Sequence, residues 1–261
     1  MTKEGFPLKQ MFLSTGKEFK EIETFEPGAW IHLVNPSQEE AMKVAERFNI
    51  DIQDLRAPLD VEETSRIDVE DDYTLILVDI PTQEERNNKS YYVTIPLGII
   101  VTDEVVVTTC LEDISLMDNF LNHRVRNFYT FMKTRFVFQI LYRNAQLYLT
   151  ALRSIDRQND KLEAQLENAT KNEHLIDMME LEKSIVYLKA SLKMNERIVK
   201  KLTGNASSLK KYIEDEDLLE DTLVETQQAI EMAGIYENVL NAMTETSASI
   251  INNNQNTIMK T

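Results

Sequence analysis

The chain has 261 residues, of which 43% are hydrophobic and 28% are charged, and its formal net charge is −16. This composition supports one large domain or two smaller ones with a buried core, and only six glycines and six prolines argue against disorder. The acidic balance argues against binding of nucleic acid or of an anionic lipid surface, because basic patches recognise both.

The first part of the chain, residues 1–112, has the pattern of short strands and a short helix. Ser37 is placed to cap the helix, because acidic residues follow in its first turn. Pro81 is expected to end the second strand, with a polar loop over 83–90. We predict a mixed-sheet α/β (α+β) domain with strands over 30–34, 73–80, 92–101 and 105–110 and a helix over 38–48.

Beyond Asp113 the pattern is almost entirely helical, and we predict three long helices over 116–169, 173–203 and 217–261. Gly204 gives the second helix a C-terminal stop signal. At 1.5 Å per residue the third helix is roughly 65 Å long, so it must project from a domain of this size. We therefore divide the chain into residues 1–112, 113–216 and 217–261.

A heptad spacing of apolar residues marks the second and third helices as partners in a helix–helix seam. Asn195 is a polar position that can set the register of the first seam. The second seam turns polar toward its end, which suits either an antiparallel helical hairpin or a parallel bundle of subunits around a water-filled axis. The seams consist of Leu181, Ile185, Leu188, Leu192, Asn195, Val199 and Leu202, and of Leu219, Leu223, Thr226, Ile230, Ala233, Glu237, Leu240, Thr244, Ser247, Ile251, Asn254 and Ile258.

Signals for catalysis or a metal centre are weak. His32, His123 and His174 are isolated, and none has a zinc-ligand spacing to another histidine or to Cys110, the single cysteine. One cysteine allows no internal disulfide and fits a reducing compartment. The acidic run at 214–217 is typical of a helix N-terminus, with a metal site as the alternative. We expect no enzyme and, without a stretch of roughly 20 apolar residues, a soluble chain.

Short motifs occur along the whole chain in a recognisable order. They are Trp30-Ile31 with Pro36 and Glu40; Phe48-Asn49-Ile50 with Asp54-Leu55; Leu59-Asp60, Glu63, Ser65-Arg66-Ile67 and Asp71-Asp72-Tyr73; Pro96 to Ile100 before a strand ending in Val107-Thr108; and Asn253, Asn256, Met259 and Lys260. With these motifs the chain resembles the cytoplasmic part of CorA-type magnesium transporters. The family's Gly-Met-Asn tripeptide follows the first membrane helix, and this sequence stops before that point.

The resemblance implies a homopentameric membrane transporter with a cytoplasmic funnel. An α/β/α domain, an antiparallel helical hairpin and a long stalk helix would form each subunit of the funnel. The stalk would continue into the cell membrane as the pore-lining helix, through segments that this sequence lacks. Asn256 and Met259 match positions that line the cytoplasmic end of the pore.

The resemblance also implies regulatory Mg²⁺ sites between neighbouring subunits. The stalk ligand corresponds to Glu245, and the ligand from the globular domain to Glu84, with Glu85 and Asp79 as alternatives. Bound Mg²⁺ would hold the ring closed, and its loss would let the acidic subunits separate and the pore hydrate. The transported ion would be Mg²⁺ or Co²⁺. A related transporter for Zn²⁺ or Ni²⁺ and a soluble coiled-coil scaffold are the alternatives.

Overall fold

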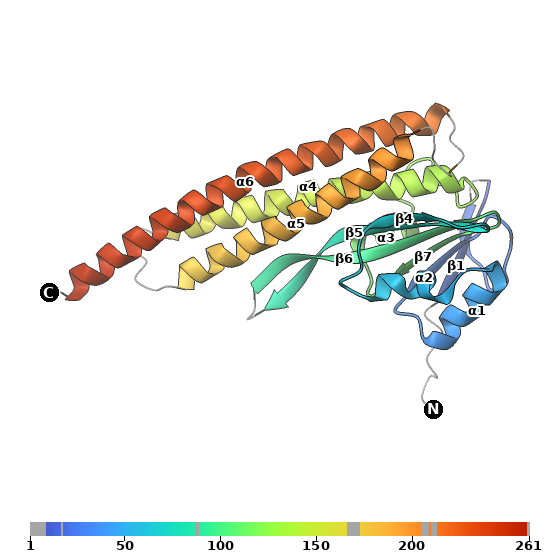
Figure 1. Ribbon diagram of the computed structural model, residues 1–261, viewed down its shortest axis with the longest axis horizontal. Helices are drawn as coiled ribbons and strands as arrows, with labels where there is room; N and C mark the ends of the chain where they lie inside the picture. Colours follow the sequence, from blue (N-terminus) through green and yellow to red (C-terminus); the bar gives the residue numbers. More distant parts are fainter. Residues whose placement is uncertain are drawn as a thin grey trace.

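The computed structural model describes residues 9–16, 18–86, 89–165, 173–204, 209 and 213–259. A seven-stranded sheet lies beneath three long helices that run side by side, and the C-terminal end of the chain lies far from the sheet (Figure 1). The predicted combination of a mixed sheet followed by long helices is confirmed.

The sheet is mixed because one pair of neighbouring strands, β3 (Trp30–Val34) and β7 (Val106–Cys110), is parallel while the other described pairs are antiparallel. The chain between these two strands includes the short helices and three further strands, so it is long enough for the crossover that a parallel pair requires. In sheet order the strands are β2 (Glu18–Glu21), β1 (Lys9–Thr15), β3 (Trp30–Val34), β7 (Val106–Cys110), β6 (Lys89–Thr102), β5 (Tyr73–Arg86) and β4 (Arg66–Val69).

Short helices cover one face of the sheet and the long helices cover the other (Figure 1). The first short helix begins as predicted: the Ser37 hydroxyl accepts a hydrogen bond from the Glu40 amide, and the Glu40 carboxylate accepts one from the Ser37 amide. The short elements are α1 (Gln38–Phe48), α2 (Ile52–Arg56) and η1 (Ala57–Leu59), and α3 (Ser115–Leu121) packs on the opposite face. This gives the expected α/β/α layering.

The predicted end of a strand at Pro81 and the predicted loop over 83–90 are wrong. Strand β5 continues to Arg86 and β6 begins at Lys89, with Pro81 opposite Thr94 and Arg86 opposite Lys89. Pro81 is tolerated because β4 pairs only with residues 74–77 of β5, so the missing amide removes no bond to a second neighbour. The extended hairpin lies along the long helix α5 (Glu173–Thr203) (Figure 1).

The predicted helix over 116–169 is also wrong, because the chain leaves the helical path between Leu121 and Lys133. His123 and Asn127 adopt left-handed backbone conformations there, each with φ of 55°. The break places the centroid of the Phe128 ring 4.7 to 6.2 Å from the ring centroids of Trp30, Phe120 and Phe136. Aromatic packing against the sheet therefore outweighs the continuation of one helix.

The three long helices are α4 (Lys133–Gln165), α5 (Glu173–Thr203) and α6 (Ile213–Met259). The bounds of α5 agree with the prediction, whereas α6 begins four residues earlier than predicted. Its early start places Asp215 beside Arg135 of α4, 2.9 Å from the Arg135 Nε atom, so the acidic run serves a helix N-terminus that is fixed by an ion pair.

The seam positions of α5 are all buried, and those of α6 are buried or half-buried as far as Ile251, in contact with α4 and α5 of the same chain. The antiparallel alternative is therefore correct for this part of the seam, and the water-filled axis is not. Thr226 and Ser247 are tolerated because their hydroxyls donate to the Thr222 and Met243 carbonyls, at 2.7 and 2.6 Å. The side chains of Asn254 and Ile258 lie outside the described residues.

Candidate functional site

The carboxylates to which the resemblance points lie on two separate elements. Glu84 and Glu85 are exposed near the end of β5, and Glu245 is exposed on α6. Within the described part of the chain no contact joins the two groups, and no three His, Cys, Asp or Glu side chains converge on a position that would hold a metal ion.

Glu84 is paired within its own chain. Its Oε2 atom lies 2.6 Å from the Arg86 Nη2 atom, and the Arg86 Nη1 atom lies 3.2 Å from the Glu180 Oε2 atom on α5. The hydrogen bond from Arg86 lowers the pKa of Glu84 below its ordinary value. Glu84 is therefore ionised at neutral pH, and a metal that binds it would compete with Arg86.

A second ion pair holds the same end of the hairpin to α5. The Lys89 Nζ atom lies 2.7 Å from both carboxylate oxygens of Asp177. The Tyr91 hydroxyl donates a longer hydrogen bond, 3.4 Å, to the same carboxylate. Because Asp177 and Glu180 are one helical turn apart, Lys89 and Arg86 bind neighbouring positions on one face of α5.

Asp79 occupies a different environment, between the sheet and the long helices. Burial raises the pKa of its carboxyl group, and hydrogen bonds from Ser191 and Ser65 oppose that rise. The Asn195 amide binds both backbone groups of Asp79: it accepts from the amide at 3.0 Å and donates to the carbonyl at 2.8 Å. Asp79 lies beyond the paired part of β4, so Asn195 replaces a neighbouring strand.

Two further side chains from α4 complete this anchor. Asn144 donates to the Asp79 carbonyl at 2.8 Å, and the Tyr148 hydroxyl donates to it at 3.1 Å. The backbone of one strand residue thus binds both α4 and α5. Asn195 thus binds the backbone of a sheet strand, and its role in setting the register of a helix–helix seam stays a prediction.

Glu245 has surroundings that suit contact with another molecule. Its carboxylate forms no ion pair with any described residue, and the exposed side chains nearby on the same helix, Ala242, Thr246 and Ser249, are small. The Ser249 hydroxyl donates to the backbone carbonyl of Glu245 at 3.3 Å and leaves the carboxylate free. A second copy can therefore approach this face closely.

The predicted pore residues, Asn256 and Met259, belong to the last turns of α6. Their backbone is helical, and their side chains lie outside the described residues. In Figure 1 this end of α6 extends beyond the neighbouring ends of α4 and α5. Among the described residues, no helix is both long enough and apolar enough to span a membrane.

Sequence reasoning missed the two ion pairs at the hairpin end. Arg86 and Glu180 are separated by 94 residues, and Lys89 and Asp177 by 88, so no local pattern connects them. The prediction of a polar loop over 83–90 also prevented their recognition, because a loop does not fix which residues of the two strands lie opposite each other. The anchor at Asp79 had a partial signal, namely one asparagine in an otherwise apolar seam.

Comparison with known proteins gives consistent results. Residues 26–261 match the family model described as CorA-like Mg²⁺ transporter protein. The cobalt/magnesium transport protein CorA of Methanocaldococcus jannaschii is 27% identical over 245 residues, which make up 88% of this chain and 72% of that protein.

Solved structures share the fold. The complete CorA magnesium transporter of Methanocaldococcus jannaschii gives a TM-score of 0.83 at 22% identity, covering 98% of this chain and 81% of that one. The soluble domain of CorA from the same organism gives 0.82 at 22% identity, covering 93% and 97%. The ZntB cytoplasmic domain of Vibrio parahaemolyticus gives 0.67 at 12% identity, covering 96% and 99%. Since the family model spans nearly the whole sequence, the chain belongs to the CorA-like Mg²⁺ transporter proteins, which are transporters rather than enzymes.

Proposed function

We propose that this chain is the cytoplasmic regulatory part of a divalent-cation transporter whose ion is Mg²⁺ or Co²⁺. In the full-length protein five copies would form a ring, and α6 would continue into the cell membrane as the pore helix, with Asn256 and Met259 at its cytoplasmic end. The observation that carries the proposal is the position of Glu245, which is exposed on the long helix α6 and forms no ion pair with any described residue, in a chain that belongs to this family.

Repulsion between the acidic copies would make the closed ring depend on bound cations. Each copy carries a formal charge of −16, so neighbouring copies repel one another when no cation lies between them. Mg²⁺ keeps most of its water and binds through one or two carboxylates, which suits one glutamate from each of two copies. Glu245 of one copy and Glu84 of the next would provide them, with Glu85 as the alternative on β5.

The linkage between Mg²⁺ binding and ring closure determines whether Mg²⁺ closes or opens the ring. A metal that binds only the closed arrangement stabilises it in proportion to its preference for that state. High Mg²⁺ would therefore hold the ring closed, and low Mg²⁺ would let the copies separate and the pore hydrate. Arg86 would weaken the site, because Mg²⁺ must displace it from Glu84.

Mg²⁺ titration of the protein tests the proposal, with thermal melting and analytical sedimentation as readouts. We expect millimolar Mg²⁺ to raise the melting temperature or promote association, and Glu84→Ala with Glu245→Ala to shift the required Mg²⁺ concentration by about tenfold. Glu231→Ala is the matched control, because Glu231 is another exposed glutamate on α6. NaCl at equal ionic strength controls for screening.

Two outcomes would count against the proposal. A wild-type protein whose melting and sedimentation ignore Mg²⁺ would remove the sensing role, and an equal shift in Glu231→Ala would show only general charge neutralisation. The sequence that follows residue 261 gives an independent check on transport. About 20 apolar residues and then Gly-Met-Asn are expected there, whereas a polar tail would favour the soluble scaffold.

A further inference from the structure

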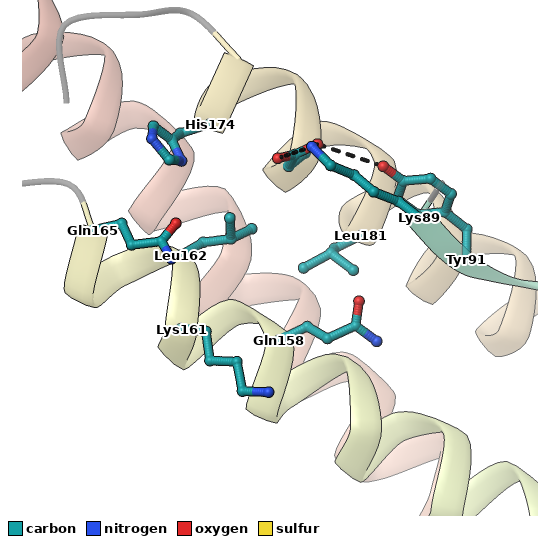
Figure 2. A pocket seen from close by; sticks show the side chains of 9 residues that line it. Lys89, Tyr91, Gln158, Lys161, Leu162, Gln165, His174 and Leu181 are labelled. Atoms are coloured by element: carbon teal, nitrogen blue, oxygen red, sulfur yellow. Dashed lines mark hydrogen bonds and ion pairs between the residues drawn. The ribbon is translucent and has the colours of Figure 1, made fainter. Parts of the chain in front are cut away.

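A cavity lies between α4 and α5 at the end of the bundle away from the short helices, where β6 meets α5 (Figure 2). Its volume is about 360 Å³. Figure 2 shows Gln158, Leu162 and Gln165 of α4 facing His174 and Leu181 of α5 across it. This volume is near the lower end of small-molecule sites, which hold roughly 300–1,000 Å³. The cavity therefore suits a small ligand rather than a peptide or a nucleic acid.

Part of the cavity wall is apolar. Leu181 is almost fully buried, Leu162 is half-buried, and the Tyr91 ring is 8% exposed. The Tyr91 hydroxyl is directed to Asp177, so the rest of its side chain supplies carbon surface to the wall. Because Leu181 and Tyr91 are already largely shielded from water, the apolar surface that a ligand with an aliphatic body would newly bury is the exposed part of Leu162.

The charged side chains that line the cavity include more positive than negative groups. Lys89 and Asp177 neutralise each other at 2.7 Å, which leaves Lys161 as a further cation. Lys161 forms no ion pair with any described residue, and its helical neighbours three and four positions away, Arg157, Gln158, Ala164 and Gln165, include no acid. An unpaired lysine beside apolar surface is notable in a chain with 44 acidic and 28 basic residues.

Polar groups that can complete an anion site lie beside this lysine. The Gln158 and Gln165 carboxamides each offer N–H donors from the same helix. Across the cavity, the His174 Nδ1 atom is shielded from solvent and has no hydrogen-bond partner within the described chain. A buried polar atom without a partner is costly, but this atom has no surface exposed to the cavity, so the anion site depends on Lys161 and the two carboxamides.

We propose that this cavity binds a small amphipathic monoanion, an aliphatic carboxylate of medium chain length. Its carboxylate would accept charge-assisted hydrogen bonds from Lys161 and a neighbouring carboxamide, while its chain would lie against Leu162, Leu181 and Tyr91. Nothing in this proposal depends on cation transport or on assembly of several copies. It uses none of the carboxylates assigned to Mg²⁺ above.

Octanoate is the probe, and its binding to the 261-residue protein is measured by calorimetry with thermal shift as a second readout. We expect Lys161→Gln to weaken octanoate binding at least about tenfold, since it replaces the unpaired lysine charge of the cavity lining with a neutral, slightly shorter polar side chain. Arg157→Gln removes a positive charge one turn away that does not line the cavity, and it should leave binding unchanged. Both residues are exposed, so neither variant should disturb folding.

Ligands that differ in chain length or charge test the proposal independently of the protein variants. Each methylene that enters the cavity should tighten binding about fourfold, so octanoate should bind more tightly than hexanoate by roughly fifteenfold. 1-Octanol, with the same chain and no charge, should bind at least about tenfold more weakly than octanoate. Equal binding to Lys161→Gln and Arg157→Gln, no gain with chain length, or no binding at millimolar octanoate would each overturn the proposal.

Discussion

Replacement of Asn195 by leucine tests the anchor between the sheet and the long helices. Asn195 is 5% exposed, and its amide binds both the N–H and the carbonyl of Asp79. Leucine has a similar volume, so the change removes hydrogen bonds with little change in packing. The Asp79 carbonyl keeps Asn144 and Tyr148 as donors, whereas its N–H loses the acceptor that Asn195 provides.

The expected cost follows from these contacts. An ordinary hydrogen bond contributes about 1 kcal/mol net, and a buried donor without a partner costs about 1–3 kcal/mol. We therefore expect Asn195→Leu to lower the free energy of unfolding by about 2–3 kcal/mol, after the gain from burying the leucine side chain. Urea unfolding followed by circular dichroism measures this change as a lower midpoint at unchanged slope.

Asn159 of α4 provides the matched control. It is also buried in the helical bundle, but its Nδ2 atom donates only to the sulfur of Met243 and its Oδ1 atom has no partner among the described residues. Asn159→Leu should be neutral or stabilising, because it removes an unsatisfied group. A loss of less than about 0.5 kcal/mol in Asn195→Leu, or equal losses in both variants, would refute the assigned role of Asn195.

Two further predictions concern the packing of the α/β domain. Burial lowers the pKa of His32 to about 4 from an ordinary value of 6.5. Because the pKa of His32 is lower in the folded state than in the unfolded state, the neutral ring contributes its full stability above pH 6.5. The free energy of unfolding then falls as the pH drops toward 4, by about 3 kcal/mol in total. His32→Gln should flatten this part of the curve of unfolding free energy against pH, and parallel curves would contradict it. A β-carbon at Gly98 would overlap the Pro58 ring, whereas one at Gly234 on α6 would have no atom closer than 3.8 Å. Gly98→Ala should therefore cost about 1–3 kcal/mol and Gly234→Ala should add about 0.5–1 kcal/mol, measured by urea unfolding; the same sign for both would contradict the packing argument.

Local signals were sufficient for several elements. Ser37 and the acidic first turn predicted α1, because capping needs only residues within one helical turn. The heptad spacing from Leu181 to Leu202 predicted the buried side of α5, since one apolar stripe must face its partner whatever that partner is. Alternating and β-branched residues likewise indicated the mixed sheet.

The candidate site was less predictable. The exposed glutamates Glu84 and Glu245 came from the order of motifs along the chain, and their contribution to a metal site stays a prediction. The ion pair between Arg86 and Glu180 needed the extended hairpin, whose register depends on which strand lies beside Pro81. No property of residues 81–90 alone distinguishes an edge strand from a polar loop.

The sequence by itself determined where helices and strands can form and which of their faces are apolar, because these depend on neighbours a few residues away. Only the tertiary structure decided how the elements end and meet. The helix over 116–169 breaks because Phe128 gains aromatic partners on the sheet and in α3 and α4, and Asn195 is required because β4 stops short of Asp79. These choices depend on contacts between residues far apart in the chain, whose free energy no local pattern contains.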